Sequence, residues 1–129
     1  MKKNKSPKPT EAELEILQIL WENGPSTVRF INDKMNVKKN VGYTTTLKIM
    51  QIMSEKNLVT RDEENRSHIY TAAYKQDETQ KVLLDKFLDS AFGGSASKLV
   101  MQALGNRKTS KEEIEEIRNF LDKIDGGKK

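Results

Sequence analysis

The segment VGYTTTLKIMQIMSEKN, residues 41–57, decides how the rest of the chain is interpreted. Leu47, Met50 and Met53 recur at three-residue steps, which predicts a helix with one apolar face. The polar positions fall on the other side of that helix, and they are Thr44, Thr45, Lys48 and Gln51. No carboxylate interrupts this polar face before Glu55. The hydroxyl, ammonium and amide groups of its side chains can donate hydrogen bonds to phosphates or to base edges. An ordinary core helix with a mildly polar outside accounts for the segment equally well when it is taken alone.

Composition limits the class of protein. A chain of 129 residues with 35% hydrophobic residues has room for one domain or two small ones and for a modest core. The absence of cysteine excludes disulfides and cysteine-based metal or redox sites. No apolar run is long enough to span a membrane, and no signal-peptide pattern follows the basic N-terminus. We therefore expect a cytoplasmic protein without membrane insertion.

The positive charge is concentrated in the first part of the chain. Residues 1–75 hold 13 Lys and Arg against nine Asp and Glu, whereas residues 76–129 hold ten against ten. This asymmetry favours a polyanion-binding module followed by a neutral appendage. A basic tail is the simpler alternative, because the lysines of residues 1–8 alone equal the excess.

Residues 10–75 have the pattern of a winged helix-turn-helix domain, after a flexible basic arm at residues 1–9. Thr10 and Glu13 have the spacing of a capping box, and the helix they begin is stopped by Gly24-Pro25. Ser26 and Thr27 are expected to cap a second helix, and a short polar turn leads to the helix over residues 41–57. Two strands, residues 58–61 and 67–72, then predict a hairpin wing with a polar tip.

The residues expected to contact DNA come from each part of this domain. Thr44, Thr45 and Lys48 are expected in the major groove, with Lys48 the best candidate for a guanine edge. Backbone contacts are expected from the remaining candidates, and these are Ser26, Thr27, Lys38, Lys39, Tyr43, Arg61 and Arg66. A winged-helix module that docks on other proteins, without reading DNA sequence, is the alternative.

Nothing in the sequence predicts catalysis. His68 is the single histidine, lies on a predicted strand and has no partner at metal-ligand spacing. The sequence has no glycine-rich phosphate loop and no pair of carboxylates in an apolar setting. We therefore expect no catalytic residue, no metal site and no cofactor.

Residues 76–125 are predicted to form three helices that end in a frayed tail at residues 126–129. Their apolar stripes are too thin for an independent core, so they need another surface. Packing on the first domain is one solution, and packing on a second copy of the chain is the solution we favour. The residues expected at this homodimer interface are Leu83, Phe87, Leu99, Leu104, Ile114, Ile117 and Leu121.

From about Thr10 to Lys123, the sequence resembles the penicillinase repressor family of bacterial transcription regulators. The order and spacing of several short matches carry the resemblance, not any one of them. They are ELEIL at residues 13–17 before LW at 20–21, GPSTV at 24–28, GYTTTL at 42–47, KNLVTR at 56–61, Arg66 with Tyr70, FGGS at 92–95 and EEIEEIR at 112–118.

The resemblance implies a winged-helix domain joined to a helical dimerisation domain that represses transcription from a two-fold-symmetric operator. It also implies inactivation when a membrane-bound sensor metalloprotease triggers cleavage in the dimerisation domain. The family's best-known cleaved bond joins Asn to Phe, and Gln102-Ala103 stands at that place here, so cleavage at this bond is not carried over. Asn57 replaces a common glycine, and Ile52 replaces a common basic residue.

Overall fold

The first helix begins and ends where local chemistry predicts. In the computed structural model, which describes residues 8–63 and 68–126, helix α1 runs over Glu11–Asn23. The Thr10 hydroxyl accepts from the Glu13 amide at 3.2 Å, and the Glu13 carboxylate accepts from the Thr10 amide at 2.9 Å. This confirms the predicted capping box. Gly24 then ends the helix at a φ of 82°, a conformation that glycine adopts without strain.

The next two helices start differently from each other. Helix α2, Val28–Met35, is capped by Thr27, whose hydroxyl accepts from the Phe30 amide at 3.1 Å. Ser26 is not part of this cap, since its hydroxyl donates to the Gly24 carbonyl at 2.8 Å. Helix α3, Tyr43–Glu55, starts after Gly42 without a side-chain cap. Its end is followed by Asn57 at a φ of 65°, a left-handed conformation that asparagine tolerates at a helix C-terminus.

A two-stranded antiparallel hairpin forms the wing. Strand β1, Val59–Asp62, pairs with β2, Ile69–Ala72, and Val59 lies opposite Ala72. Residues 64–67, which complete the hairpin, lie outside the described residues. Ser26 and Tyr70 exchange two backbone hydrogen bonds of 3.0 and 2.8 Å, so the hairpin is attached to the start of α2.

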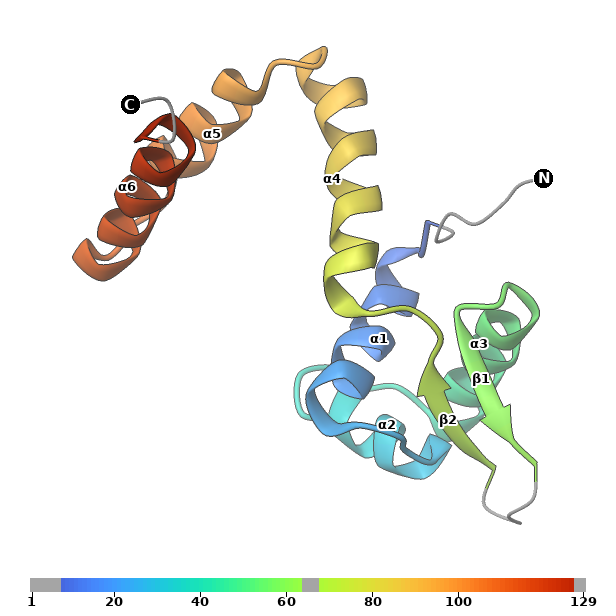
Figure 1. The fold of residues 1–129 in the computed structure, drawn as a ribbon. Helices are drawn as coiled ribbons and strands as arrows, with labels where there is room; N and C mark the ends of the chain where they lie inside the picture. The colour runs from blue at the N-terminus through green and yellow to red at the C-terminus, as the bar shows by residue number, and fades with distance from the viewer. Residues whose placement is uncertain (1–7, 64–67, 127–129) are drawn as a thin grey trace, which may run out of the picture. The chain divides into compact units, whose positions relative to one another are not determined.

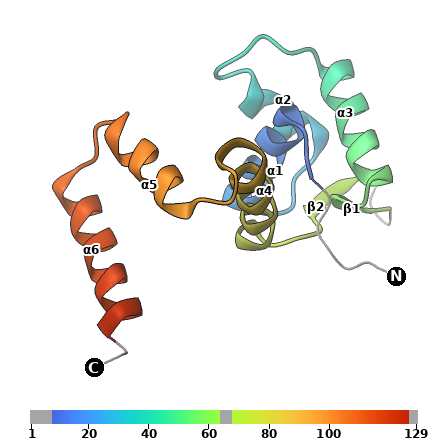
Figure 2. The same ribbon diagram turned by 90° about the horizontal axis from the view of Figure 1, so that it is seen from above.

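The core lies among α1, α2, α3 and the hairpin. Helix α1 packs against α2, α3 and β2, and α3 also packs against β1 (Figure 1, Figure 2). Full burial of a valine, leucine, isoleucine or methionine side chain stabilises a fold by roughly 1.5–3 kcal/mol. The buried apolar residues are Ile16, Leu17, Leu20, Val28, Ile31, Met35, Met50, Met53, Leu58, Val59 and Tyr70.

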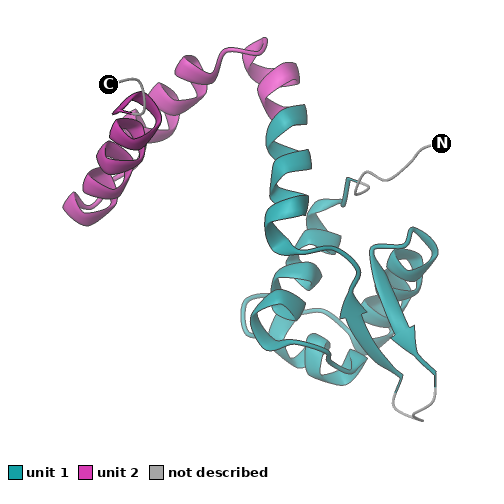
Figure 3. Ribbon diagram, in the orientation of Figure 1, with its two compact units in different colours: residues 1–86 teal, residues 87–129 magenta. Residues whose placement is uncertain are grey.

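The chain divides into two compact units, residues 1–86 and 87–129 (Figure 3). Helix α4, Gln76–Phe92, begins in the first unit and ends in the second. Gly93 and Gly94, at φ values of 57° and 84°, separate it from α5, Ala96–Gly105. The last helix, α6, covers Lys111–Gly126, and the Ser110 hydroxyl accepts from the Glu113 amide at 3.0 Å at its start.

The predicted fold class is confirmed: the chain is mainly α-helical, with a small β-hairpin wing followed by three helices. Among the described residues, none of these helices has the length and apolarity that crossing a membrane requires.

Candidate nucleic-acid interface

Helix α3 exposes the polar face that its sequence pattern predicts. Thr44, Thr45 and Lys48 are exposed, as is Gln51, whereas Met50 and Met53 are fully buried. Leu47 is half-buried beside the core. The structure therefore brings the three predicted groove-contacting residues together on the solvent side of one helix.

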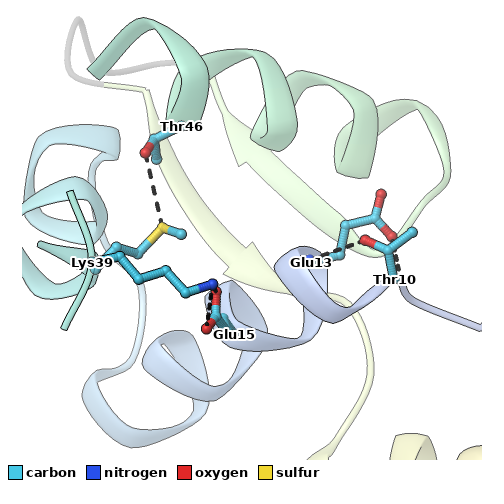
Figure 4. A network of polar contacts seen from close by, with 6 residues as sticks. Thr10, Glu13, Glu15, Lys39 and Thr46 are labelled. Carbon is cyan, nitrogen blue, oxygen red and sulfur yellow. Dashed lines mark hydrogen bonds and ion pairs between the residues drawn. The ribbon is translucent and has the colours of Figure 1, made fainter. Parts of the chain in front are cut away.

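The start of α3 is held against α2 by a small hydrogen-bond network. The Asn32 amide group donates to the hydroxyl of Thr46 at 2.7 Å and to the Val41 carbonyl at 3.0 Å. Thr46 is fully buried and also contacts the sulfur of Met35 at 3.9 Å (Figure 4). Asn36 adds two hydrogen bonds to the Val41 backbone, of 2.8 and 3.0 Å. These contacts position the exposed face of α3, and the sequence pattern did not identify the two asparagines.

The end of α3 is held by a partly buried ion pair. Lys56 Nζ lies 2.7 Å from the carboxylate of Glu13, whose side chain is only 5% exposed. Burial alone would raise the pKa of Glu13, but the hydrogen bonds from Lys56 and Thr10 outweigh it and lower that pKa. Figure 4 shows Glu13 beside Thr10, so one carboxylate both caps α1 and anchors the residue after α3.

The predicted phosphate-binding residues near α2 are in different situations. The Ser26 side chain is buried and bonded to Gly24, and the Thr27 hydroxyl is used by the helix cap. Lys38 is exposed in the turn between α2 and α3. Lys39 is also exposed, but its ammonium lies 3.0 Å from the carboxylate of Glu15 on α1 (Figure 4). Since exposed pairs of this kind stabilise by only about 0–1 kcal/mol, Lys39 remains able to exchange Glu15 for a phosphate.

On the wing, Arg61 and Glu63 form an exposed pair with 2.8 Å between nitrogen and oxygen. The hydrogen bond between them raises the pKa of the Arg61 guanidinium and lowers the pKa of Glu63. The pair shows how an acidic residue near the hairpin tip is neutralised by an arginine. Arg66, the other wing residue predicted to contact DNA, lies outside the described residues.

One basic residue of this surface was missed by the sequence analysis. Arg29, in the first turn of α2, places its guanidinium carbon 5.3 Å from the centre of the Tyr43 ring. Both residues are exposed. A signal was present, because Arg29 follows the cap Thr27 by two residues and is not one of the inward positions of α2.

The first turns of α2 and α3 contain no acidic residue, whereas those of α1 and α4 contain two each. Acidic side chains normally offset the positive end of a helix dipole. The N-termini of α2 and α3 therefore keep their positive potential, and this potential favours an anionic ligand at this surface. Among the described residues, no group of three or more His, Cys, Asp or Glu side chains is arranged to hold a metal ion.

The predicted dimerisation residues lie on α4, α5 and α6, and none is fully buried. Leu99, Leu104 and Ile117 line a shallow hollow between α5 and α6. Phe87 is 53% exposed and Leu121 is 56% exposed. Leu83 and Ile114 are half-buried.

Comparison with known proteins places the chain in a family. The model of the family described as penicillinase repressor matches residues 9–123. The chain belongs to the penicillinase repressor family. The match includes α3, the hairpin, α4, α5 and most of α6, so the family's pattern extends over both compact units.

Relatives with assigned roles are distant in sequence but similar in length. The penicillinase repressor of Staphylococcus aureus is 24% identical, with 94% of this chain and 96% of that protein covered. The transcriptional regulator BlaI of Mycobacterium tuberculosis is 23% identical, with 91% and 85% covered. The methicillin resistance regulatory protein MecI of Staphylococcus aureus strain N315 is 22% identical, with 93% and 98% covered.

Among solved structures, the chain is similar to a point mutant of Lactococcus lactis ZitR, with 19% identity and a TM-score of 0.46. That likeness covers 100% of this chain and 82% of the other. The assignment to the family rests on the family model. As a member of the penicillinase repressor family, the chain is a transcriptional regulator and not an enzyme.

Proposed function

We propose that the chain is a repressor that binds a two-fold-symmetric DNA operator as a homodimer. The observation that carries this proposal is the exposed face of α3, on which Thr44, Thr45 and Lys48 stand together without a carboxylate. The hydrogen bonds at one end of α3 and the Glu13–Lys56 pair at the other hold that face in place. Rigid support is what a base-reading helix requires, because groove contacts demand accurate placement.

In this proposal α3 enters the major groove and reads base edges. Lys48 donates to a guanine edge, and the hydroxyls of Thr44 and Thr45 contact neighbouring bases or phosphates. Lys38 and Lys39 set the register on the sugar-phosphate backbone, the ring of Tyr43 supports the backbone contacts at the start of α3, and Arg61 and Arg66 add contacts from the wing. Thr27 and Ser26 contribute through their position at the start of α2, since their hydroxyls are used within the fold.

The homodimer forms through the apolar residues that α4, α5 and α6 leave exposed. Two copies related by a two-fold axis present two α3 helices to two half-sites of an operator. The alternative is a module that docks on other proteins. It does not explain why the polar face of α3 and the first turns of α2 and α3 contain no acidic residue.

Regulation of an antibiotic-resistance-type gene is proposed from the names of the penicillinase and methicillin-resistance relatives. Relief of repression by proteolysis in the dimerisation domain, through a membrane-bound sensor metalloprotease system, completes the proposal. Gln102 and Ala103 are exposed but lie inside α5, whereas proteolytic nicking favours loop tips. Cleavage at that bond therefore requires α5 to unwind locally.

The test is selection of bound duplexes from a random pool by the full chain, followed by affinity measurements on the selected duplex. We expect the pool to converge on an inverted repeat. Lys48→Ala is expected to lose about 1–3 kcal/mol of discrimination, roughly 5- to 150-fold, at one position of each half-site. Lys98→Ala, which removes an exposed lysine from α5, is the matched control and should bind as the wild type does.

Two results would overturn the proposal. One is a pool that stays random, with weak binding that does not depend on salt, which would favour the protein-docking module. The other is a Lys48→Ala variant that prefers the same duplex as strongly as the wild type.

A further inference from the structure

We propose that Arg29 and Tyr43 act together as one clamp on the DNA backbone, in which Arg29 binds a phosphate and the Tyr43 ring positions its guanidinium. This inference rests on the proposed function, because the clamp belongs to the same DNA-binding surface. It gives a binding role to Arg29 and makes Tyr43 a positioning residue.

The two residues connect the helix that supports the interface to the helix that reads it. Arg29 lies in the first turn of α2, and Tyr43 is the first residue of α3. The guanidinium carbon of Arg29 and the centre of the Tyr43 ring are 5.3 Å apart. The two helices that carry them are fixed relative to each other, because Asn32 and Asn36 donate to the Val41 carbonyl just before α3. The Arg29–Tyr43 pair therefore occupies a defined place beside the exposed face of α3.

Arg29 differs in its partners from three other basic residues near this surface. Lys39 is paired with Glu15, Lys56 with Glu13 and Arg61 with Glu63. Over residues 8–63 and 68–126, no carboxylate forms an ion pair with Arg29. Its charge also lies at the positive end of α2, where a cation is disfavoured and an anion is favoured. A DNA phosphate would relieve this unfavourable placement.

A cation–π contact with a ring leaves the guanidinium free to bind a phosphate. An arginine over an aromatic face keeps its N–H donors along the edge of its plane, where they can form two parallel bonds to phosphate oxygens. The ring also reduces the number of conformations that the long side chain samples, so less freedom is lost on binding. Lysine in place of Arg29 would keep the charge but lose the planar, two-pronged donor.

The experiment measures the affinity of the full chain for the selected duplex and for a scrambled duplex over a series of salt concentrations. Arg29→Ala is expected to weaken both duplexes by about tenfold per half-site and to reduce the salt slope by about one per half-site. Arg29→Lys should keep most of the slope and lose part of the affinity. Tyr43→Phe should bind nearly as the wild type does, whereas Tyr43→Leu should lose most of what Arg29→Ala loses.

The double variant Arg29→Ala/Tyr43→Leu should bind no worse than Arg29→Ala alone, since the ring acts through the arginine. The matched control is Lys34→Ala, which removes a cation 5.5 Å from the Phe30 ring on the same helix. Lys34 is five positions beyond Arg29 and so points about 140° away around α2. Its removal should leave the salt slope unchanged, and thermal melting should show that every variant is folded.

Four other results would contradict part or all of this inference. Arg29→Ala binding like the wild type, or Lys34→Ala losing as much as Arg29→Ala, would overturn the clamp while the proposed function stands. Additive losses in the double variant would overturn the positioning role of Tyr43. A wild-type chain that shows no salt-dependent binding to any duplex would overturn the proposed function and the clamp together.

Discussion

The described part of the first unit, residues 8–63 and 68–86, encloses a core of eleven buried apolar side chains, whereas residues 87–126 of the second unit bury none of theirs fully. Both parts consist mainly of amphipathic helices, so the difference lies in what the helices pack against. In the first unit three helices and a hairpin close around one another, which removes apolar surface from water on several sides. The final helices keep Phe120, Leu121 and Ile124 between 56% and 60% exposed. The contrast teaches that the first unit is stabilised from within, while the second needs another surface.

The largest expected effect uses the same substitution in both units. Met50 is fully buried and Met101 is 72% exposed. Met50→Ala should lower the free energy of unfolding by about 2–5 kcal/mol, because it leaves a cavity in the core. Met101→Ala should change it by no more than about 0.5 kcal/mol. Urea unfolding at low protein concentration measures both, and equal losses would break the comparison.

An intermediate effect concerns acid. Because the folded state lowers the pKa of Glu13, this carboxylate stabilises the fold fully above the ordinary glutamate pKa, and the contribution is lost as pH falls through the lowered value. Glu13→Gln should cost about 1–3 kcal/mol near neutral pH, where Lys56 loses its partner, and should flatten the acid dependence. Denaturant unfolding at several pH values provides the measurement.

The matched control for Glu13 is Glu115→Gln in the second unit, which breaks the exposed 3.6 Å pair with Arg118. That change should cost less than about 1 kcal/mol and leave the acid dependence as it was. If the two glutamine variants behaved alike, burial of Glu13 would not be the source of its effect.

The smallest expected effect on the fold is at the surface of α6, where the consequence should be dissociation. Leu121→Asp places a charge within the proposed homodimer interface and should raise the dimer dissociation constant by at least about tenfold, since ~1.4 kcal/mol is a factor of ten. Asn119→Asp adds the same charge at an exposed position of the same helix and should change it little. Sedimentation velocity over a concentration series separates the two, and a wild-type chain that stays monomeric would contradict the proposed dimer.

Much of the first unit was predictable because its signals are local. Thr10 and Glu13 meet within one helical turn. The positive φ of Asn57 is a property of that residue itself. A hydrophobic period of three residues distinguishes α3 from the hairpin, whose period is two. None of these requires knowledge of a distant residue. The exposed face of α3 follows for the same reason, since a helix with a buried Met50 must turn Lys48 outward.

The partners of the charged residues were not predictable. Lys39 meets Glu15, and Lys56 meets Glu13, across 24 and 43 positions of sequence. Arg29 and Tyr43 lie on different helices, and Asn32 and Asn36 hold the turn between those helices. The backbone pairing of Ser26 with Tyr70 was likewise not predictable. Ser26 was expected to cap α2, and in the structure it attaches the wing to the start of that helix.

The order of residues alone therefore determined the helices, the hairpin, the polar face of α3 and the family to which the chain belongs, because these depend on periodicity, caps and short spacings. Tertiary structure alone decided which cations are already neutralised and which apolar stripes find a partner within the chain. The physical reason is that charge pairing and burial depend on distances between segments far apart in sequence, and only packing brings those segments together.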